Sequence, residues 1–337
     1  MAGFNVLFTS SGRRVSLVRL FRKSFAREKI RARLVGVDLS PLAPTAQVAD
    51  KFYLAPRVDA PDYIPRLLQI CKKERIKLVV PLIDTELLIQ ARSREAFAQI
   101  GAFAMISAPE TIELAMDKLK TSDFFQAQGC RAVRTYRLED PRWKTELKFP
   151  LILKPARGSA GIGVHKVNDE AELRVLARGL PEPLVQEYIH GREYTCSIFI
   201  DLKGKVRTVL PRLRLEVRGG EVSKGMTVRN KKLIAFVRKA AAALPGAVGA
   251  LNLQVFEDAH GEFRISELNP RFGGGFPLAY WAGADFPWWL YLMLNKRLER
   301  VKTDRWKAGV IMLRYDDEII IKASPHQGRR IIAQSVK

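Results

Sequence analysis

The stretch from residue 151 to residue 167, which reads LILKPARGSAGIGVHKV, constrains the fold more than any other part of the chain. A short apolar run ends at Lys154, a glycine-rich loop follows, and a second strand-forming run comes after it. Glycines allow successive backbone N–H groups to turn toward an anion, and a lysine at a strand end adds positive charge. Because the lysine precedes the glycines and no helix follows, this is not the GxxxxGK[ST] phosphate loop. The pattern predicts a β-hairpin that binds phosphate, although a flexible surface hairpin would have the same composition.

The composition indicates a protein of two or three packed units, because the chain has 337 residues and 47% of them are hydrophobic. No apolar run is long enough to span a membrane and no secretion signal is recognisable, so we expect a cytoplasmic protein. The three cysteines lie far apart in apolar surroundings, which favours free buried thiols, and the four histidines form no metal-ligand cluster. The net charge of +22 is spread over the whole chain without a nucleic-acid-binding motif, so we do not expect nucleic acid as a partner.

Residues 1–110 alternate between strand and helix patterns. Apolar runs at residues 5–9, 34–37 and 77–80 are typical of buried strands, and apolar residues recur at helical spacing over residues 17–25 and 64–71. This alternation predicts an α/β domain with a doubly wound parallel sheet.

The turn after the first strand reads SSGRR and leaves two interpretations open. A strand, a glycine turn, a helix and an acid after the next strand are typical of a dinucleotide fold, but the turn has only one glycine of that fingerprint. Arg13 and Arg14 would crowd a pyrophosphate. At a helix N-terminus these two arginines suit an anionic ligand and a solvent-facing surface equally.

Acidic residues follow the strand that ends at Pro81, at the sheet edge where open α/β sheets carry ligands. Asp84 and Glu86 are therefore candidates to contact a substrate amine. The alternative is that Asp84 or Thr85 caps the helix that follows.

A second candidate for ligand binding is the arginine-rich segment PRLRLEVRGGEVSKGMTVR, which surrounds a Gly-Gly turn. Arg212 and Arg214 are two residues apart, so they share one face of a strand and could bind a carboxylate or phosphate. Arg218 lies near the turn and is a third candidate. The same charges would also protect an exposed edge strand.

The segment ALNLQVFEDAHGEFRISELNPRFGGG, residues 250–275, predicts a hairpin with one polar face. Asn252 and Gln254 share a face of the first strand, and the returning strand carries Glu267, Asn269 and Arg271 at two-residue spacing. A turn centred between residues 259 and 260 would place the two amides beside Glu267. Such oxygen ligands suit Mg²⁺, and the arginine could stabilise a transferring phosphoryl group. An ion pair between Glu267 and Arg271 is the structural alternative.

Five motifs in one order resemble the ATP-grasp ligases, close to the group of the carbamoyl phosphate synthase large subunit. They are MDK at 116–118, LILKP with RGSAGIG at 151–163, VQEYIHGREY at 185–194, LNLQ at 251–254 and ELNPRFGGG at 267–275. The resemblance covers nearly the whole chain. It implies a Rossmann-like domain over residues 1–110, a small ATP-grasp lobe with a glycine-rich lid over 111–188, and a large lobe with a C-terminal extension over 189–337, where the class passes from α/β to α+β.

The resemblance also implies roles for individual residues. ATP phosphates would meet Lys118, Lys154 and the loop of Gly158, Ser159, Gly161 and Gly163. Adenine would lie against Glu187, Tyr188 and Ile189, and the ribose against Glu193. Two Mg²⁺ ions, which Mn²⁺ may replace, would be held by Gln254, Glu267 and Asn269. Arg271 and Lys154 would be catalytic cations. Independently of the resemblance, the spacing of the arginine-rich segment makes Arg218 a third candidate catalytic cation, and the candidates for substrate binding remain Arg13, Arg14, Asp84, Glu86, Arg212 and Arg214.

The expected reaction is ATP-dependent activation of a small carboxylate as an acyl phosphate, with release of ADP, and capture by an amine. The chain resembles one synthetase half without a duplicate, a glutaminase-like Cys and His pair or a biotin-handling domain, so carbamoyl phosphate synthesis and carboxylation are not expected. An ATP-binding regulator, a nucleic-acid-binding protein and a kinase of a small carboxylate remain alternatives. The apolar run FPWWLYLML at 286–294 predicts a packed helix or the face of a homodimer.

Overall fold

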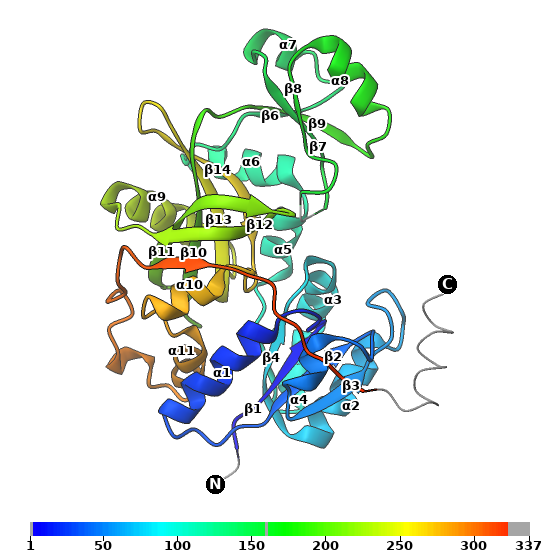
Figure 1. The fold of residues 1–337 in the computed structure, drawn as a ribbon, viewed down its shortest axis with the longest axis vertical. Helices are drawn as coiled ribbons and strands as arrows, with labels where there is room; N and C mark the ends of the chain where they lie inside the picture. Colours follow the sequence, from blue (N-terminus) through cyan, green and yellow to red (C-terminus); the bar gives the residue numbers. More distant parts are fainter. Residues whose placement is uncertain (1–2, 159–160, 323–337) are drawn as a thin grey trace.

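The computed structural model describes residues 3–158 and 161–322. Three β-sheets form three parts of the molecule (Figure 1): a parallel sheet near the N-terminus, a small sheet at the far end and a large sheet between them. The three sheets lie within the three residue ranges expected from the sequence. The α/β class is thereby confirmed, with a parallel N-terminal domain followed by two antiparallel lobes.

The N-terminal sheet has the strand order β3-β2-β1-β4-β5, and all its strands are parallel. Side chains of β1 alternate between two cores: Val6 and Phe8 pack with α1, whereas Leu7 packs with α2, α3 and α4. Helices therefore cover both faces, as in a doubly wound sheet. The elements are β1 (Asn5–Thr9), α1 (Val15–Arg27), β2 (Leu34–Asp38), β3 (Lys51–Leu54), α2 (Tyr63–Glu74), β4 (Ile76–Pro81), α3 (Leu87–Arg92), α4 (Arg94–Gln99) and β5 (Phe103–Ala104).

The two edge strands of this sheet, β3 and β5, were not predicted from the sequence. β3 has no fully buried residue, and β5 has only two residues. An edge strand needs no continuous apolar run, because only part of it faces the core. Such strands are defined by pairing with β2 and β4, which a local pattern does not report.

The small lobe is a four-stranded sheet of order β6-β9-β7-β8 with two short helices. β7 and β8 pair antiparallel from Leu151 opposite Val167 to Leu153 opposite His165, which confirms the predicted hairpin. Trp143 and Leu173 from the helices pack on this sheet. The elements are β6 (Thr135–Arg137), α7 (Arg142–Glu146), β7 (Leu151–Pro155), β8 (His165–Val167), α8 (Glu170–Ala177) and β9 (Pro183–Glu187).

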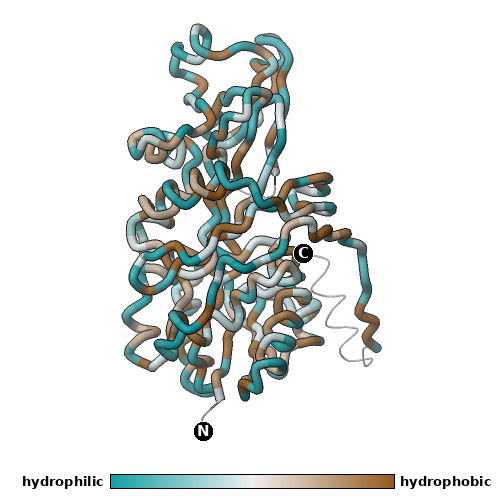
Figure 2. The backbone as a smooth tube through the Cα atoms, turned by 90° about the vertical axis from the view of Figure 1, so that its left-hand side faces the viewer, coloured by the Kyte–Doolittle hydropathy of each residue, from teal (hydrophilic) through white to brown (hydrophobic). Residues whose placement is uncertain are grey.

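The large lobe is a six-stranded antiparallel sheet of order β14-β13-β10-β11-β12-β15. Apolar residues of β10 and β13, such as Cys196 and Leu253, pack beneath it against α9. On the other side of the same strands, Thr195, Ser197, Asn252 and Gln254 form a polar stretch, and Phe199 and Ala250 beyond it join the core that reaches the N-terminal domain. Figure 2 shows hydrophobic and hydrophilic stretches alternating along the chain in all three parts. The elements are β10 (Gly191–Ile200), β11 (Val206–Arg218), β12 (Glu221–Thr227), α9 (Lys231–Ala242), β13 (Gly249–Asp258), β14 (Phe263–Asn269), α10 (Phe276–Trp281), α11 (Phe286–Leu294) and β15 (Ile311–Leu313).

Two helices, α5 (Pro109–Met116) and α6 (Lys118–Ala127), join the N-terminal domain to the small lobe. Both contact β14, and Phe125 of α6 is fully buried in the core of the large lobe. The packing therefore favours grouping these helices with the large lobe, although the sequence division placed them with the small lobe. As a result, the large lobe holds Lys118, the first residue of α6, next to the small lobe.

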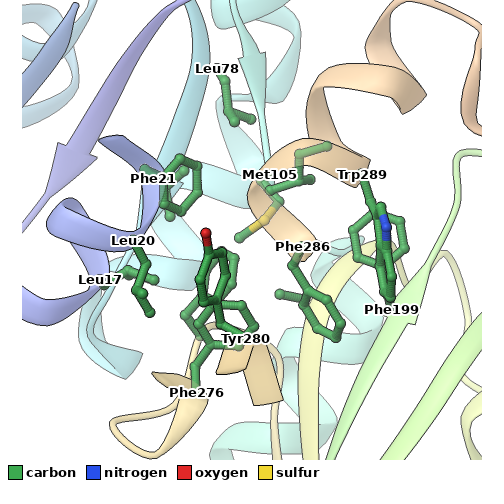
Figure 3. Packing of buried hydrophobic residues seen from close by; sticks show 14 of the residues in the cluster. Leu17, Leu20, Phe21, Leu78, Met105, Phe199, Phe276, Tyr280, Phe286 and Trp289 are labelled. Carbon is green, nitrogen blue, oxygen red and sulfur yellow. The ribbon is translucent and has the colours of Figure 1, made fainter. Parts of the chain in front are cut away.

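One continuous core joins the N-terminal domain to the large lobe. Phe21 of α1 and Met105 lie with Tyr280 of α10 and Trp289 of α11 (Figure 3). The apolar run at 286–294 is thus a packed helix, as one of its two interpretations proposed, and its buried face is unavailable to a second copy. The three cysteines are free and buried, as expected. Among the described residues, no helix is long and apolar enough to cross a membrane.

Candidate active site

A cavity of about 570 Å³ lies where the three parts of the molecule meet. The N-terminal domain lines it with Arg14 and residues 82–85, and the small lobe lines it with Lys154 and part of the glycine-rich loop. The polar face of the large sheet forms its floor. The floor residues, from four neighbouring strands, are Glu193, Thr195, Arg212, Arg214, Asn252, Gln254, Glu267 and Asn269.

Strand register explains how distant residues meet on this floor. Thr195 of β10 lies opposite Arg212 on one side and Gln254 on the other, and Gln254 lies opposite Glu267 of β14. Directly opposed residues of antiparallel strands project on the same face. The structure confirms the expectation that Asn252 and Gln254 lie near Glu267, but the register differs from the expected one. A turn centred between residues 259 and 260 would place Glu267 opposite Asn252, whereas Glu267 lies opposite Gln254, and the register shifts at a bulge between Gln254 and Val255.

Two lysines approach the cavity from above the floor. Lys154, at the end of β7, is buried and donates a hydrogen bond to Gln186 Oε1 at 2.8 Å. Lys118, at the start of α6, donates to the carbonyl of Gly158 at 2.9 Å. Burial lowers the pKa of Lys154 to about 8 and also lowers the pKa of Lys118, and the Glu267 carboxylate opposes both shifts. Neither ammonium contacts a carboxylate among the described residues, so each can accept an anion.

The donor set of the floor fits a hard cation. Glu267, Gln254 and Asn269 offer a carboxylate and two amide oxygens, and in the described part of the chain none of these side chains makes a hydrogen bond or ion pair within the protein. Hard cations such as Mg²⁺ take oxygen ligands and complete their octahedron with water and phosphate. Among the described residues, no three His, Cys, Asp or Glu side chains form a group that could hold a metal ion, so this candidate set depends on its two amides.

Asp84 and Arg271 form an ion pair across two parts of the molecule. The carboxylate accepts hydrogen bonds from Arg271 Nε at 2.7 Å and from Nη2 at 2.5 Å. Asp84 therefore does not cap the following helix. The carboxylate of Glu86 instead accepts hydrogen bonds from the backbone N–H groups of Leu82 and Ile83, which precede this helical segment.

A second charged group closes the same side of the cavity. Glu221, at the start of β12, lies 3.1 Å from Arg14 Nη1 and 2.8 Å from Arg314 Nη1. Arg14 comes from the N-terminal domain and Arg314 from the segment after β15. Glu221 thus holds three distant segments together, and no local pattern around residue 221 predicted this role.

The glycine triplet (residues 273–275) lies against these charged side chains. A Cβ added at Gly274 would lie 2.6 Å from Arg14 Nη1 and 2.6 Å from Glu221 Oε2. One added at Gly275 would lie 2.2 Å from Arg212 Nη1. None of the three glycines has a positive φ. The glycines are therefore required for close approach and not for an unusual backbone conformation.

The hinge between the lobes supplies the opposite wall. The carboxylate of Glu187 accepts from the backbone N–H and the side chain of Arg134, and Arg264 lies 3.7 Å away. Tyr188 and Ile189 line the cavity beside it. The Glu187 carboxylate is thus paired with arginines, and its backbone N–H donates to the carbonyl of Arg134 at 3.0 Å. The adenine contact expected of residues 187–189 stays a prediction.

Glu193 also lies where it was expected and also has a partner. It pairs with Arg214 Nη1 at 2.8 Å, and Arg214 Nη2 donates to the carbonyl of Gly220. Burial raises the pKa of Glu193, and the guanidinium opposes that shift. A ribose hydroxyl would have to share this carboxylate with Arg214.

Three predicted residues lie outside the cavity. Arg218 is at the tip of the β11–β12 hairpin, where its side chain is 71% exposed and pairs with Asp316. Arg13 is exposed and does not line the cavity. Glu86 is fully buried, with Tyr63, Ser10 and Gln90 as side-chain partners. None of these side chains reaches the cavity. Arg218 extends into solvent from the end of its hairpin, and hydrogen bonds to the backbone keep Glu86 in the interior.

The glycine-rich loop is only partly described. Gly158 and Gly161 line the cavity, and Gly163 lies just beyond, where a Cβ would meet Leu180 at 2.8 Å. Ser159 lies outside the described residues. All three described glycines have positive φ, between 71° and 117°, so this loop needs glycine for its backbone.

Several cavity residues were missed by sequence reasoning. Gln186 orients Lys154, Thr195 links two rows of the floor, and Glu221 joins Arg14 to Arg314. The alternation of Glu193, Thr195 and Ser197 against apolar neighbours in β10 was a readable signal for one polar face. Glu221 offered no such signal, because its partners are more than ninety residues away.

Three protein families match successive parts of the chain. "PylC-like, N-terminal domain" matches residues 6–106, "D-ala D-ala ligase C-terminus" matches 125–216, and "ATP-grasp in the biosynthetic pathway with Ter operon" matches 179–317. Together these matches cover most of the chain, and the second and third overlap over residues 179–216.

Individual proteins show the same relationship. D-alanine–D-alanine ligase B of Pseudomonas putida is 32% identical over 184 residues, which are 48% of this chain and 56% of the ligase. The large chain of carbamoyl phosphate synthase from Thermoplasma volcanium is 23% identical over 74% of this chain and 26% of its own length. This chain thus spans about half the length of the first of these relatives and about a quarter of the second.

A solved structure shares the overall fold. The biotin carboxylase domain of 2-oxoglutarate carboxylase from Hydrogenobacter thermophilus, crystallised with MgADP and bicarbonate, superposes with a TM-score of 0.73 at 18% identity. The match covers 92% of this chain and 74% of that domain. The shared fold, the family matches and the motif order together place this chain in the ATP-grasp superfamily.

Proposed function

We propose that this protein is an ADP-forming carboxylate–amine ligase. The observation that carries the proposal is the meeting, in one cavity, of two cations and a row of oxygen ligands. The cations are the buried Lys154 and the half-buried Lys118, neither with a carboxylate partner among the described residues, and the opposing row is Glu267, Gln254 and Asn269. Cations on one side and oxygen ligands on the other suit a triphosphate with its metal ions between the two lobes. The ATP-grasp fold and the D-alanine–D-alanine ligase relatives support the same reaction class.

The reaction has two steps. A carboxylate oxygen of the acid attacks the γ-phosphorus of ATP, and the bond from that phosphorus to the β–γ bridging oxygen breaks. ADP is released, and the acid becomes an acyl phosphate. An amine then attacks the acyl carbon, the bond from that carbon to the phosphate oxygen breaks, and phosphate leaves while the nitrogen loses a proton. In the proposal, Lys118 and Lys154 bind the phosphates and Arg271 neutralises charge that develops on the transferred phosphoryl group.

The proposed roles of the remaining residues follow from their positions. Glu267, Gln254 and Asn269 would hold two Mg²⁺ ions, which Mn²⁺ could replace. Bound there, the metal would supply charge neutralisation on the phosphates. Residues 187–189 would face the adenine and Glu193 the ribose. The glycine-rich loop would cover the phosphates and protect the acyl phosphate from water.

The test is nucleotide turnover with Glu267→Gln as the diagnostic variant. Wild-type protein is incubated with Mg-ATP and pools of amino acids and small carboxylates, and ADP, AMP and phosphate are measured. We expect ADP and phosphate that require both an acid and an amine, and a loss of about 10²-fold or more in Glu267→Gln. Glu95→Gln is the matched control, because Glu95 lies on α4, which packs away from the cavity.

Each other outcome points elsewhere. AMP would contradict the acyl phosphate route. ADP that needs an acid but no amine would make the protein a carboxylate kinase, and nucleotide binding without turnover across the pools would favour a regulator.

A further inference from the structure

One cationic side chain that lines the cavity has no part in the proposed reaction. Six cationic side chains line it, and three are paired with acids: Arg14 with Glu221, Arg214 with Glu193, and Arg271 with Asp84. The other three, without a carboxylate partner among the described residues, are Lys118, Lys154 and Arg212. The proposed function uses the two lysines and leaves Arg212 unexplained.

Arg212 is a buried guanidinium whose hydrogen bonds are mostly unmade. It is 2% exposed, and its Nη2 donates to Asn252 Oδ1 at 2.9 Å. Nε is buried without a partner, and no hydrogen bond of Nη1 is found within the described chain. A neutral amide is thus its single polar partner. Burial lowers its pKa to about 10, so it keeps its charge at neutral pH.

Although the Arg212 guanidinium is buried, it borders the cavity and is not enclosed in the hydrophobic core. Arg212 lines the cavity together with Val222 and the glycine triplet. Gly275 leaves room for Nη1, because a Cβ there would lie 2.2 Å from that atom. Asn252, which accepts from Nη2, also donates to the backbone carbonyl of Arg271 at 2.7 Å. The side chain is therefore fixed between the sheet floor and the triplet.

The position of Arg212 on the sheet separates it from the proposed metal ligands. Arg212 of β11, Thr195 of β10, Gln254 of β13 and Glu267 of β14 lie directly opposite one another in that order across the sheet. Adjacent strands are about 4.8 Å apart, so the backbones of Arg212 and Glu267 are separated by three such spacings. An anion at Arg212 would lie on the side of Arg14 and Glu221, because Gly275 contacts Arg212 and the neighbouring Gly274 contacts both of those residues.

We infer that Arg212 binds a carboxylate of a substrate that takes no part in phosphoryl transfer. An unpaired buried guanidinium favours a planar anion that it can bind through two parallel hydrogen bonds. The inference rests on the proposed function and narrows it: one substrate carries a second anionic group, as in an amino acid that serves as the amine or a dicarboxylic acid that serves as the acid. A simple monoacid or a plain amine would leave Arg212 unpaired.

The experiment measures binding without turnover. Wild-type protein loaded with Mg²⁺ and the non-hydrolysable analogue AMP-PNP is titrated by calorimetry with matched probes: alanine against alaninamide, and succinate against succinamate. We expect a carboxylate probe to bind at least about tenfold more tightly than its amide, because a site built for a charged group rejects the neutral analogue. That preference should be lost in Arg212→Gln and reduced in Arg212→Lys, which keeps the charge without the fork.

Two controls separate this role from others. Affinity for Mg-AMP-PNP should be unchanged in Arg212→Gln, and Arg92→Gln, an exposed arginine of the N-terminal domain, should bind every probe as the wild type does. If Arg212→Gln does not fold, the comparison within the wild type and Arg212→Lys still decides.

The inference is overturned by equal binding of each carboxylate and its amide to the wild type, by absence of carboxylate binding, or by an unchanged preference in a folded Arg212 variant. A loss of nucleotide affinity with the preference retained would assign Arg212 to the transferred phosphoryl group instead. Because no step requires ADP formation, these results are independent of the turnover test.

Discussion

Two glycine-rich segments border the same cavity, and they use glycine for opposite reasons. In the glycine-rich loop (residues 158–163) the described glycines have positive φ, and a Cβ at Gly158 would meet nothing within 4 Å. In the glycine triplet no φ is positive, but Cβ atoms at Gly274 and Gly275 would collide with charged side chains. The loop needs backbone freedom, whereas the triplet needs space. Similar strings of glycine therefore predict different consequences of the same substitution.

The largest effect is expected from Gly275→Ala. The new methyl group would lie 2.2 Å from Arg212 Nη1 and 2.6 Å from Val222 Cγ1, so both side chains must shift. Gly275 has no positive φ, so the backbone tolerates alanine and we expect the fold to persist while the site changes. A misplacement of about 1 Å can cost about 10²-fold in rate, and we expect a loss of that order in kcat/KM. The measurement is ADP formation together with the unfolding midpoint.

Gly179→Ala is the control, because Gly179 has open space and an ordinary φ. If Gly275→Ala retained full activity, close packing on Arg212 would have no functional meaning. A large loss of stability would instead identify the triplet as a structural element.

A smaller effect on the triplet side is expected from Asp84→Asn. Asp84 holds Arg271, two residues before the triplet, through two charge-assisted hydrogen bonds. The neutral amide accepts less strongly and frees the arginine, which should lower kcat by about tenfold with little change in KM for ATP. Asp59→Asn, an exposed acid paired with Arg57, should leave both constants unchanged. An increase in kcat would mean that Asp84 withholds Arg271 from the reaction.

On the loop side, pH should control ATP binding through Lys154. Burial lowers its pKa to about 8 from an ordinary value of about 10.4, and bound phosphates favour the protonated form. ATP affinity should therefore be constant below pH 8 and should fall above it by up to about tenfold per pH unit, with uptake of a proton on binding. Calorimetry at pH 9 in buffers of different ionisation enthalpy measures that uptake, and Lys154→Met should abolish it. Release of a proton would contradict the lowered pKa.

The same lysine affects folding in the opposite direction. Between about pH 8 and 10.4 the unfolded chain binds this proton and the folded chain does not, so the free energy of unfolding attributable to Lys154 rises with pH over that window. Nucleotide binding and stability should thus respond to pH with opposite signs.

The contrast between the two segments also shows what the sequence could predict. The β7–β8 hairpin, the polar face of β13 and β14 and the nearness of Asn252 and Gln254 to Glu267 all follow from patterns of period two within about fifteen residues. The partners of the triplet do not: Arg14 and Glu221 reach Gly274 from segments that only the tertiary fold brings together. Arg218 was misplaced for a related reason: the Gly-Gly turn beside it was recognised, but the sequence does not show that this turn lies at the exposed end of its hairpin.

The smallest effect is expected from Gly161→Ala in the loop. Gly161 has a φ of +71°, and an added Cβ would lie 3.6 Å from Gly220, an ordinary contact. The cost is therefore conformational, about 1 kcal/mol for an L-residue in this region, and it should appear as roughly fivefold weaker ATP binding, because the loop must adopt this conformation to cover phosphates. Binding of carboxylate probes at Arg212 should be unchanged.

Gly261→Ala is the matched control, since Gly261 has a φ of +76° in open space and belongs to a turn outside the cavity. This variant should carry the same strain without the loss of ATP affinity. If both variants lost stability equally and neither lost affinity for ATP, the glycines with positive φ would serve folding alone. The backbone freedom of the loop and the close packing of the triplet would then no longer explain separate binding of ATP and of the carboxylate substrate.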